Sequence, residues 1–260
     1  MLRISNAARG KYVAYCEGDD YWHNRSKLDK QVSFLSTNPT YGLVHSDYDV
    51  LYEGRRKLVR NFVGILKMLD DSNAFCEVLI NRRIILTVTV CLVRALLSEA
   101  LQHHAELMDD SWPMSDLQTW LEVARVTKIK YLPESLATYY VHPESASQSR
   151  DLLKVLRFRK RTRDLILHYA EKYSCPVEIK NEARAIMALG LMRYAYEAED
   201  SGIMEELLQD TRPHFKKLPF TSMLYYYGAR GGVLRSLVRP GLLAIRILNR
   251  ARGVSGWRTF

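Results

Sequence analysis

Short apolar runs separated by polar segments dominate the N-terminal part of the chain and predict strands. Residues 12–16, 41–48 and 84–93 are rich in Val, Ile, Leu, Tyr and Thr, which favour extended structure. The first run is too short for a helix, so we expect a strand buried on both faces of a parallel sheet. Two further extended pieces are expected at 128–132 and 136–141, on either side of a turn at 133–134.

Helical spacing of apolar residues predicts helices between these strands. Leu28, Val32 and Leu35 recur at i, i+4 and i+7 behind a capping residue, Asn24, and the Asn-Pro pair at 38–39 ends the pattern. Residues 94–103 predict a second helix. Residues 52–72 carry many charges and no firm period, which suits a variable insertion.

A third helix is predicted to begin near Ser115, where Ser115 and Gln118 form a capping box. Asp116 falls in its first turn, where the helix dipole favours a carboxylate and keeps it ionised. The apolar stripe of this helix comprises Leu117, Trp120, Leu121 and Ala124.

Beyond Arg150 the strand signal ends. Helical spacing at 152–169, 177–198 and 203–208 predicts an α-helical appendage, so we expect one domain over residues 1–150 and a helical region over 151–260. The first of these helices is basic, which suits either a solvated face or a contact for anionic groups. Its basic residues are Lys154, Arg157, Arg159, Lys160, Arg161 and Arg163.

The formal charge of +9 is concentrated at the C-terminal end. Residues 211–260 contain ten Lys or Arg and no Asp or Glu, whereas residues 1–210 are nearly neutral. Leu234, Leu237, Val238, Leu242, Ile245 and Leu248 lie near one helical face, interrupted at Pro240-Gly241. Such a basic amphipathic segment fits two arrangements equally: on an anionic membrane surface, or packed on the domain with Arg outward.

The cysteines and the hydropathy indicate a cytoplasmic protein, placed at the inner membrane face if the tail binds lipid. Cys16, Cys76, Cys91 and Cys175 have no paired spacing, so we expect reduced thiols. No stretch reaches the roughly 18 apolar residues of a spanning helix. With 47% hydrophobic residues, the 260-residue chain can bury a substantial core.

The first predicted strand ends in an acidic loop, Glu17-Gly-Asp19-Asp20. Mg²⁺ and Mn²⁺ prefer carboxylate oxygens, usually one or two of them combined with substrate phosphates. Ligands in open α/β sheets bind just beyond the carboxyl end of such a strand. By itself the tetrapeptide fits a metal site and an acidic surface turn equally well. Likewise, Asp116 fits an ordinary helix-start acid, and His142 fits an ordinary hydrogen-bonded histidine as well as a ligand.

Taken in order, these pieces resemble the family 2 glycosyltransferases, inverting enzymes with the GT-A fold that use nucleotide-sugar donors. The first half of the resemblance is Asn6-Ala-Ala-Arg-Gly-Lys-Tyr-Val-Ala, Glu17-Gly-Asp-Asp-Tyr-Trp, Lys27-Leu, Gln31-Val, Phe34-Leu and Asn38-Pro39. The second half is Ser115-Asp116-Leu117, Trp120-Leu121, Tyr131-Leu-Pro-Glu, then Tyr139 and His142 with residues 145–149. The resemblance implies a partial GT-A sheet, which is Rossmann-like, with flanking helices.

The resemblance also implies roles for individual residues. Glu17, Asp19 and Asp20 match the acidic motif that binds the donor, with Mg²⁺ or Mn²⁺ held by Asp19 and Asp20 on the donor diphosphate. His142 matches a position that completes the metal site in some members. Asp116 matches the catalytic base. The family often has Arg after the residue matching Tyr139, but Tyr140 stands there in this chain.

Only residues 1–150 take part in the resemblance. The strands and the Tyr-Asn turn that bind the base and ribose of the donor have no counterpart, so we expect a fragment, a misassigned start or a degenerate copy. Two hypotheses remain: transfer of a sugar to a saccharide or lipid-linked acceptor in bacterial surface polysaccharide synthesis, or a catalytically incomplete remnant or binding subunit. A nucleic-acid binder ranks last, because the sequence has no recognised motif for one.

Overall fold

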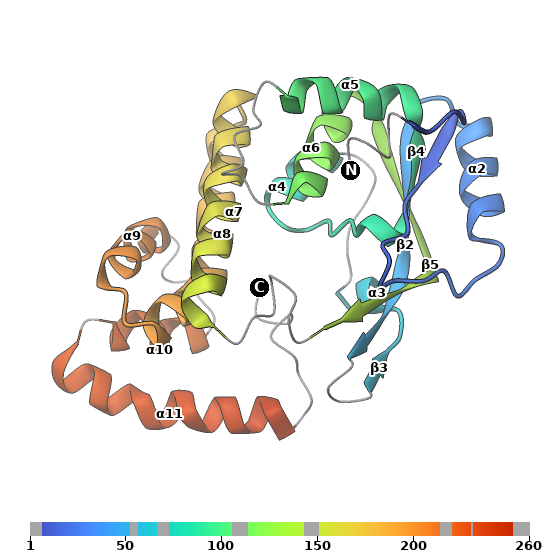
Figure 1. Cartoon of the computed structure of the whole chain (residues 1–260). Helices are drawn as coiled ribbons and strands as arrows, with labels where there is room; N and C mark the ends of the chain where they lie inside the picture. Colours follow the sequence, from blue (N-terminus) through green and yellow to red (C-terminus); the bar gives the residue numbers. More distant parts are fainter. Residues whose placement is uncertain are drawn as a thin grey trace. The chain divides into compact units, whose positions relative to one another are not determined.

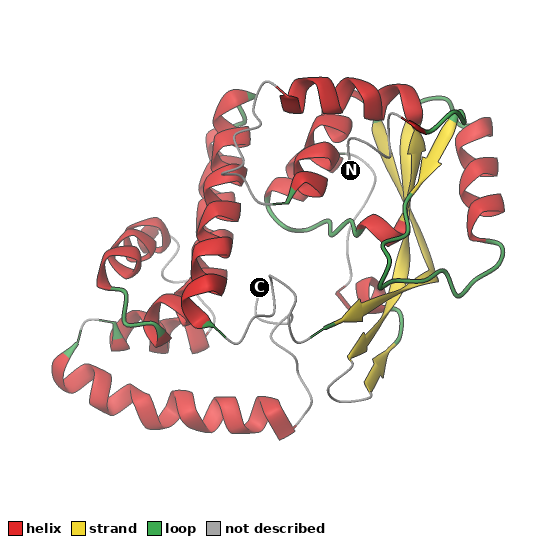
Figure 2. Ribbon diagram, in the orientation of Figure 1, coloured by secondary structure: helices red, strands yellow, loops and turns green. Residues whose placement is uncertain are grey.

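The structure, a computed structural model, describes residues 7–52, 57–66, 73–105, 114–142, 151–213, 220–229 and 231–251. The chain divides into two compact units, Met1–Gln148 and Ser149–Phe260 (Figure 1). The N-terminal unit is mixed α/β and the C-terminal unit is helical (Figure 2).

A mixed sheet forms the centre of the N-terminal unit. Its longest inner strand, β2, pairs in parallel with β5 and antiparallel with β3 and β4, and β1 pairs antiparallel with β4. The expected parallel sheet is found only in part, in the β2–β5 pair, because an apolar run is compatible with burial in either kind of sheet. The strands are β1 (Tyr12–Ala14), β2 (Tyr41–Tyr52), β3 (Lys57–Val59), β4 (Val90–Val93) and β5 (Lys128–Val141).

Helices cover both faces of this sheet (Figure 1). Helix α2 packs on β2 and β4 from one side, and α4, α5 and α6 lie together on the other, while α3 packs on β2. The helices are α2 (Lys27–Thr37), α3 (Phe62–Leu66), α4 (Ala74–Leu79), α5 (Arg94–Ala105) and α6 (Ser115–Val126), with a 3₁₀ turn, η2 (Thr87–Thr89). The helix predicted at 94–103 is confirmed.

Helix α2 packs through a face shifted from the predicted one, although Leu35 is buried as predicted and Val32 packs beside it. Leu28 is exposed, whereas Lys27, Gln31 and Leu35 are buried at i, i+4 and i+8. Gln31 Nε2 donates to the carbonyl of Thr89 at 2.8 Å, and Lys27 Nζ donates to Gln31 Oε1 at 2.8 Å. These hydrogen bonds make burial of a polar face favourable, which apolar spacing cannot reveal. Asn24 is not the capping residue; the helix follows Ser26.

The structure differs from the sequence predictions at three other places. The run 84–93 forms a strand only from Val90, because residues 87–89 form the 3₁₀ turn. The predicted turn at 133–134 is an irregularity inside one continuous strand, β5, whose register with β2 shifts there. Helix α6 has no side-chain cap: the residue before it, Met114, adopts φ 62°, and Ser115 is already helical. The described residues of the predicted insertion at 52–72 include β3 and α3.

The C-terminal unit is helical in its described residues, as the spacing beyond Arg150 predicts. Pro240 lies inside a continuous helix, so the predicted interruption there is wrong. A proline removes one backbone hydrogen bond but does not end a helix when packing supports both sides. The helices are α7 (Leu152–Lys172), α8 (Val177–Glu197), α9 (Ser201–Thr211), α10 (Phe220–Gly228) and α11 (Gly232–Ala251).

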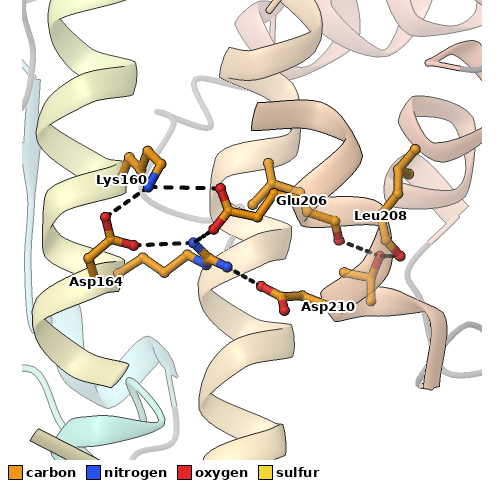
Figure 3. Close-up of polar contacts among 8 residues, drawn as sticks. Lys160, Asp164, Glu206, Leu208 and Asp210 are labelled. Carbon is orange, nitrogen blue, oxygen red and sulfur yellow. Dashed lines mark hydrogen bonds and ion pairs between the residues drawn. The ribbon is translucent and has the colours of Figure 1, made fainter. Parts of the chain in front are cut away.

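An ion network joins α7 to α9 (Figure 3). Arg163 is buried and pairs with Glu206 at 2.6 Å and with Asp210, while Lys160 pairs with Asp164 at 2.8 Å. The basic residues of α7 are therefore not all solvated: Arg163 is used internally. In the parts of the chain that the structure describes, no helix is long and apolar enough to cross a membrane.

Candidate functional site

The acidic loop follows β1 and is fastened to β5. Asp20 N donates to Glu17 O at 3.1 Å, which closes a turn around Gly18. Tyr21 and Thr138 then exchange two backbone hydrogen bonds, of 3.3 and 2.8 Å, as an isolated antiparallel bridge. The loop is thereby held in place by a strand more than a hundred residues away in the sequence.

Asp20 is the buried member of the loop. Its Oδ1 accepts a hydrogen bond from Tyr140 N at 2.8 Å, while Oδ2 is buried with no hydrogen-bond partner among the described residues. The pKa of Asp20 is raised to about 7, chiefly by burial and also by the neighbouring charges of Asp19 and Glu17, against the lowering effect of the hydrogen bond from Tyr140. A buried carboxylate oxygen without a partner is costly, so it is a natural place for a cation or a hydrogen-bond donor.

Asp116 lies close enough to the loop to interact with it electrostatically. Loss of solvation raises the pKa of Glu17, and the negative charges of Asp116 and Asp19 add to this shift. Asp116 comes from the first turn of α6, far along the chain from the loop. The structure therefore brings together the acidic loop and the acid predicted to be the base.

Asp116 is half-buried, and burial raises its pKa. Hydrogen bonds from the backbone N–H groups of Leu117 and Asp116 and from the side chain of Thr87 act in the opposite direction. Thr87 belongs to η2. This turn also accepts a hydrogen bond from Trp22, which follows the acidic loop: Trp22 Nε1 donates to Val88 O at 3.0 Å. The 3₁₀ turn thus links the acidic loop to the start of α6.

Tyr139 lies among these carboxylates. Burial raises its pKa to about 12, and the charges of four carboxylates contribute. These are Asp20, Glu17, Asp19 and Asp116. The phenol is therefore a hydrogen-bond donor in this setting and adds no negative charge to the acidic cluster.

His142 lies at the edge of the same cluster. Its electrostatic interaction with Asp20 lowers the pKa of that carboxyl group, and the His142 ring centroid is 4.6 Å from that of Tyr140. In the described residues, however, no three His, Cys, Asp or Glu side chains are grouped as a metal site. Asp19, Asp20 and His142 are thus near one another without forming a complete ligand set. Two carboxylates with substrate phosphates is the commoner arrangement for Mg²⁺.

Two residues that shape the cluster were not predicted from the sequence in these roles. Thr87 lies within an apolar, β-branched run that predicted a strand, whereas it forms part of the 3₁₀ turn. Tyr140, expected as the place of a missing Arg, supplies the backbone N–H that holds Asp20. Only the polar Thr-x-Thr pattern inside the run at 87–89 could have signalled the first of these.

Fold and cluster together define a mixed α/β protein with an acidic centre at one end of its sheet. No protein-family model matches the chain. A segment of 54 residues is 44% identical to uncharacterised proteins of Mycobacterium bovis and of two Mycobacterium tuberculosis strains. It makes up 21% of this chain and 16% of each relative, so the match spans about a sixth of the curated relatives' length.

Proposed function

We propose that the N-terminal unit is the catalytic part of a metal-dependent, inverting glycosyltransferase of family 2 with the GT-A fold. It moves a sugar from a nucleoside-diphosphate donor to a saccharide or lipid-linked acceptor at the cytoplasmic face of a bacterial membrane, in surface polysaccharide synthesis. The observation that carries the proposal is the convergence of Glu17, Asp19 and Asp20 with Asp116. Their separation in sequence makes this convergence a product of the fold.

The residues present fit a divalent cation on the donor side. The buried Asp20 Oδ2 lacks a partner in the described residues, and Asp19 is exposed next to it. These two carboxylates would hold Mg²⁺ or Mn²⁺, with His142 as a further ligand and Glu17 contacting the donor. Such an ion would supply charge neutralisation for the leaving nucleoside diphosphate.

Asp116 acts on the acceptor. Its carboxylate takes the proton of the acceptor hydroxyl while that oxygen attacks the anomeric carbon from the face opposite the diphosphate, so that the C–O bond to the diphosphate breaks and the configuration inverts. The raised pKa of Asp116 suits this task, because a base is most effective when its pKa approaches the working pH.

The experiment uses the full chain with Mn²⁺ and a panel of uridine, guanosine and thymidine diphosphates and their sugar conjugates. We expect Mn²⁺-dependent diphosphate binding by calorimetry and release of diphosphate from at least one conjugate. Asp19→Ala should weaken the Mn²⁺-dependent binding by at least about 10-fold, as loss of a metal contact does. Asp116→Asn should keep the binding and lower turnover by about 10²–10⁴-fold.

Asp29→Asn is the matched control for the base, because Asp29 is an exposed acid in the first turn of another helix, α2. It should turn over as the wild type does. Normal turnover by Asp116→Asn would exclude that base. If the wild-type chain binds the diphosphate but shows no turnover with any conjugate, the alternative is supported, a catalytically incomplete binding subunit.

A further inference from the structure

Helices α10 and α11 pack closely on each other. A Cβ at Gly228 of α10 would lie 2.6 Å from Val238 Cγ2 of α11, so only glycine permits this approach. Leu242 of α11 is buried, at 5% exposure. Val238 and Leu242 are one helical turn apart, so they mark the side of α11 that packs within the C-terminal unit.

The other side of α11 is apolar and exposed. Val233 is 76% exposed and Leu237 is 70% exposed, and Pro240 and Ala244 continue this row as exposed residues. Their spacing of i, i+4, i+7 and i+11 places these four residues, here named the α11 apolar face, along one side of the helix. Leu234 and Leu243, 41% and 55% exposed, lie at its two edges. Scattered exposed apolar residues are ordinary, but a continuous row marks an interaction surface.

The charged residues of α11 are all basic. Arg239 is exposed on α11, while Arg235 pairs with Glu199 at 2.6 Å and lies over the Tyr196 ring. The sequence from Thr211 to Phe260 contains no Asp or Glu. A partner for this face must therefore bind apolar side chains and carry negative charge.

We infer that the α11 apolar face docks on an anionic lipid bilayer. The side chains of Val233 and Leu237 enter the boundary between headgroups and acyl chains, and Arg239 contacts lipid phosphates. A second copy of the chain is a poorer occupant, because pairing two such faces would bring Arg against Arg with no acid in either segment. The inference does not depend on the acidic cluster.

The test is flotation of the full chain with vesicles of phosphatidylcholine alone or mixed with phosphatidylglycerol. We expect at least about 10-fold more protein to float with the mixed vesicles, with less at high salt. Leu237→Asp should lower this binding by about 10-fold or more, and Arg239→Glu by about fivefold. Val177→Asp is the matched control, since Val177 is an apolar residue with 63% exposure on α8; it should float as the wild type does.

Circular dichroism checks that each variant is folded. If Leu237→Asp does not fold, Arg239→Glu still tests the inference. The inference is overturned if the wild type fails to float with anionic vesicles, or if Val177→Asp and Leu237→Asp lose binding equally. A dimer in sedimentation experiments that Leu237→Asp dissociates, without flotation, would overturn it in favour of a second copy. Asp116→Asn should float normally, which separates this test from that of the proposed enzyme.

Discussion

Helices α2 and α11 are both amphipathic in sequence, but they use their faces in opposite ways. Helix α2 buries Lys27 and Gln31 and leaves Leu28 exposed. Helix α11 leaves Leu237 exposed while it buries Leu242. The spacing of apolar residues thus predicts that a helix forms, whereas the face that packs depends on which groups the neighbouring element presents.

The surface beneath α2 offers backbone acceptors. The carbonyls of Thr89 and Val90 lie where the 3₁₀ turn passes into β4, and Gln31 and Lys27 donate to them at 2.8 and 3.4 Å. A buried carbonyl without a donor costs about 1–3 kcal/mol, so polar side chains pack better there than leucine would. Lys27 also lies 4.6 Å from the Trp22 ring, next to the acidic loop. The polar face of α2 thus stabilises the segment that positions the candidate site.

The largest expected effect is at Gln31, which is fully buried. Gln31→Leu would leave the Thr89 carbonyl without its donor and the Lys27 ammonium without the amide oxygen. We expect a loss of about 4 kcal/mol in the free energy of unfolding, since a buried charge loses a partner as well. Urea unfolding followed by tryptophan fluorescence measures it, because Trp22 and Trp120 both lie in the N-terminal unit.

Gln102→Leu is the control for this substitution, because Gln102 is exposed on α5. It should change stability by about 0.5 kcal/mol or less. Equal effects of the two substitutions would contradict the importance of the polar face of α2.

Burial of Lys27 in the polar face of α2 should make the stability of the fold depend on pH. Burial lowers its pKa to about 8, below the ordinary value near 10.4. The unfolded chain therefore holds this proton more strongly, and the folded chain gains stability as pH rises from about 8 to about 10. The gain should reach about 3 kcal/mol and be absent in Lys27→Met.

Unfolding midpoints in urea between pH 7.5 and 10 would measure this gain. Lys30→Met is the control, since Lys30 is exposed on the same helix and pairs with Glu134 at the surface. It should retain the wild-type pH dependence. A constant difference between wild type and Lys27→Met across this range would refute the linkage.

The sequence predicted the order of elements better than their contacts. Apolar runs and helical spacing located β1, β2, α5 and the helices beyond Arg150. They did not reveal that β1 runs antiparallel to β4, because strand direction depends on which distant strand lies beside it. The continuous helix through Pro240 was missed for a similar reason: packing of Val238 and Leu242 on either side outweighs one lost hydrogen bond.

For the candidate site, the motif identified the carboxylates but not their surroundings. Glu17, Asp19, Asp20 and Asp116 could be chosen from residue type and position. That Asp20 is buried against Tyr140, and that Thr87 contacts Asp116, depends on β5 and η2 lying on either side of the loop. Contacts between residues so far apart in the chain leave no local pattern to detect.

The smallest expected effect compares the two sides of α11. Leu242→Ala removes a buried side chain from the contact with the rest of the C-terminal unit and should cost about 2 kcal/mol. Leu237→Ala removes an exposed side chain and should change stability by about 0.5 kcal/mol or less. Helical circular dichroism during urea unfolding measures both. If Leu237→Ala proved as destabilising as Leu242→Ala, the α11 apolar face would be packed within the protein in solution, and the contrast between the two sides of α11 would be lost.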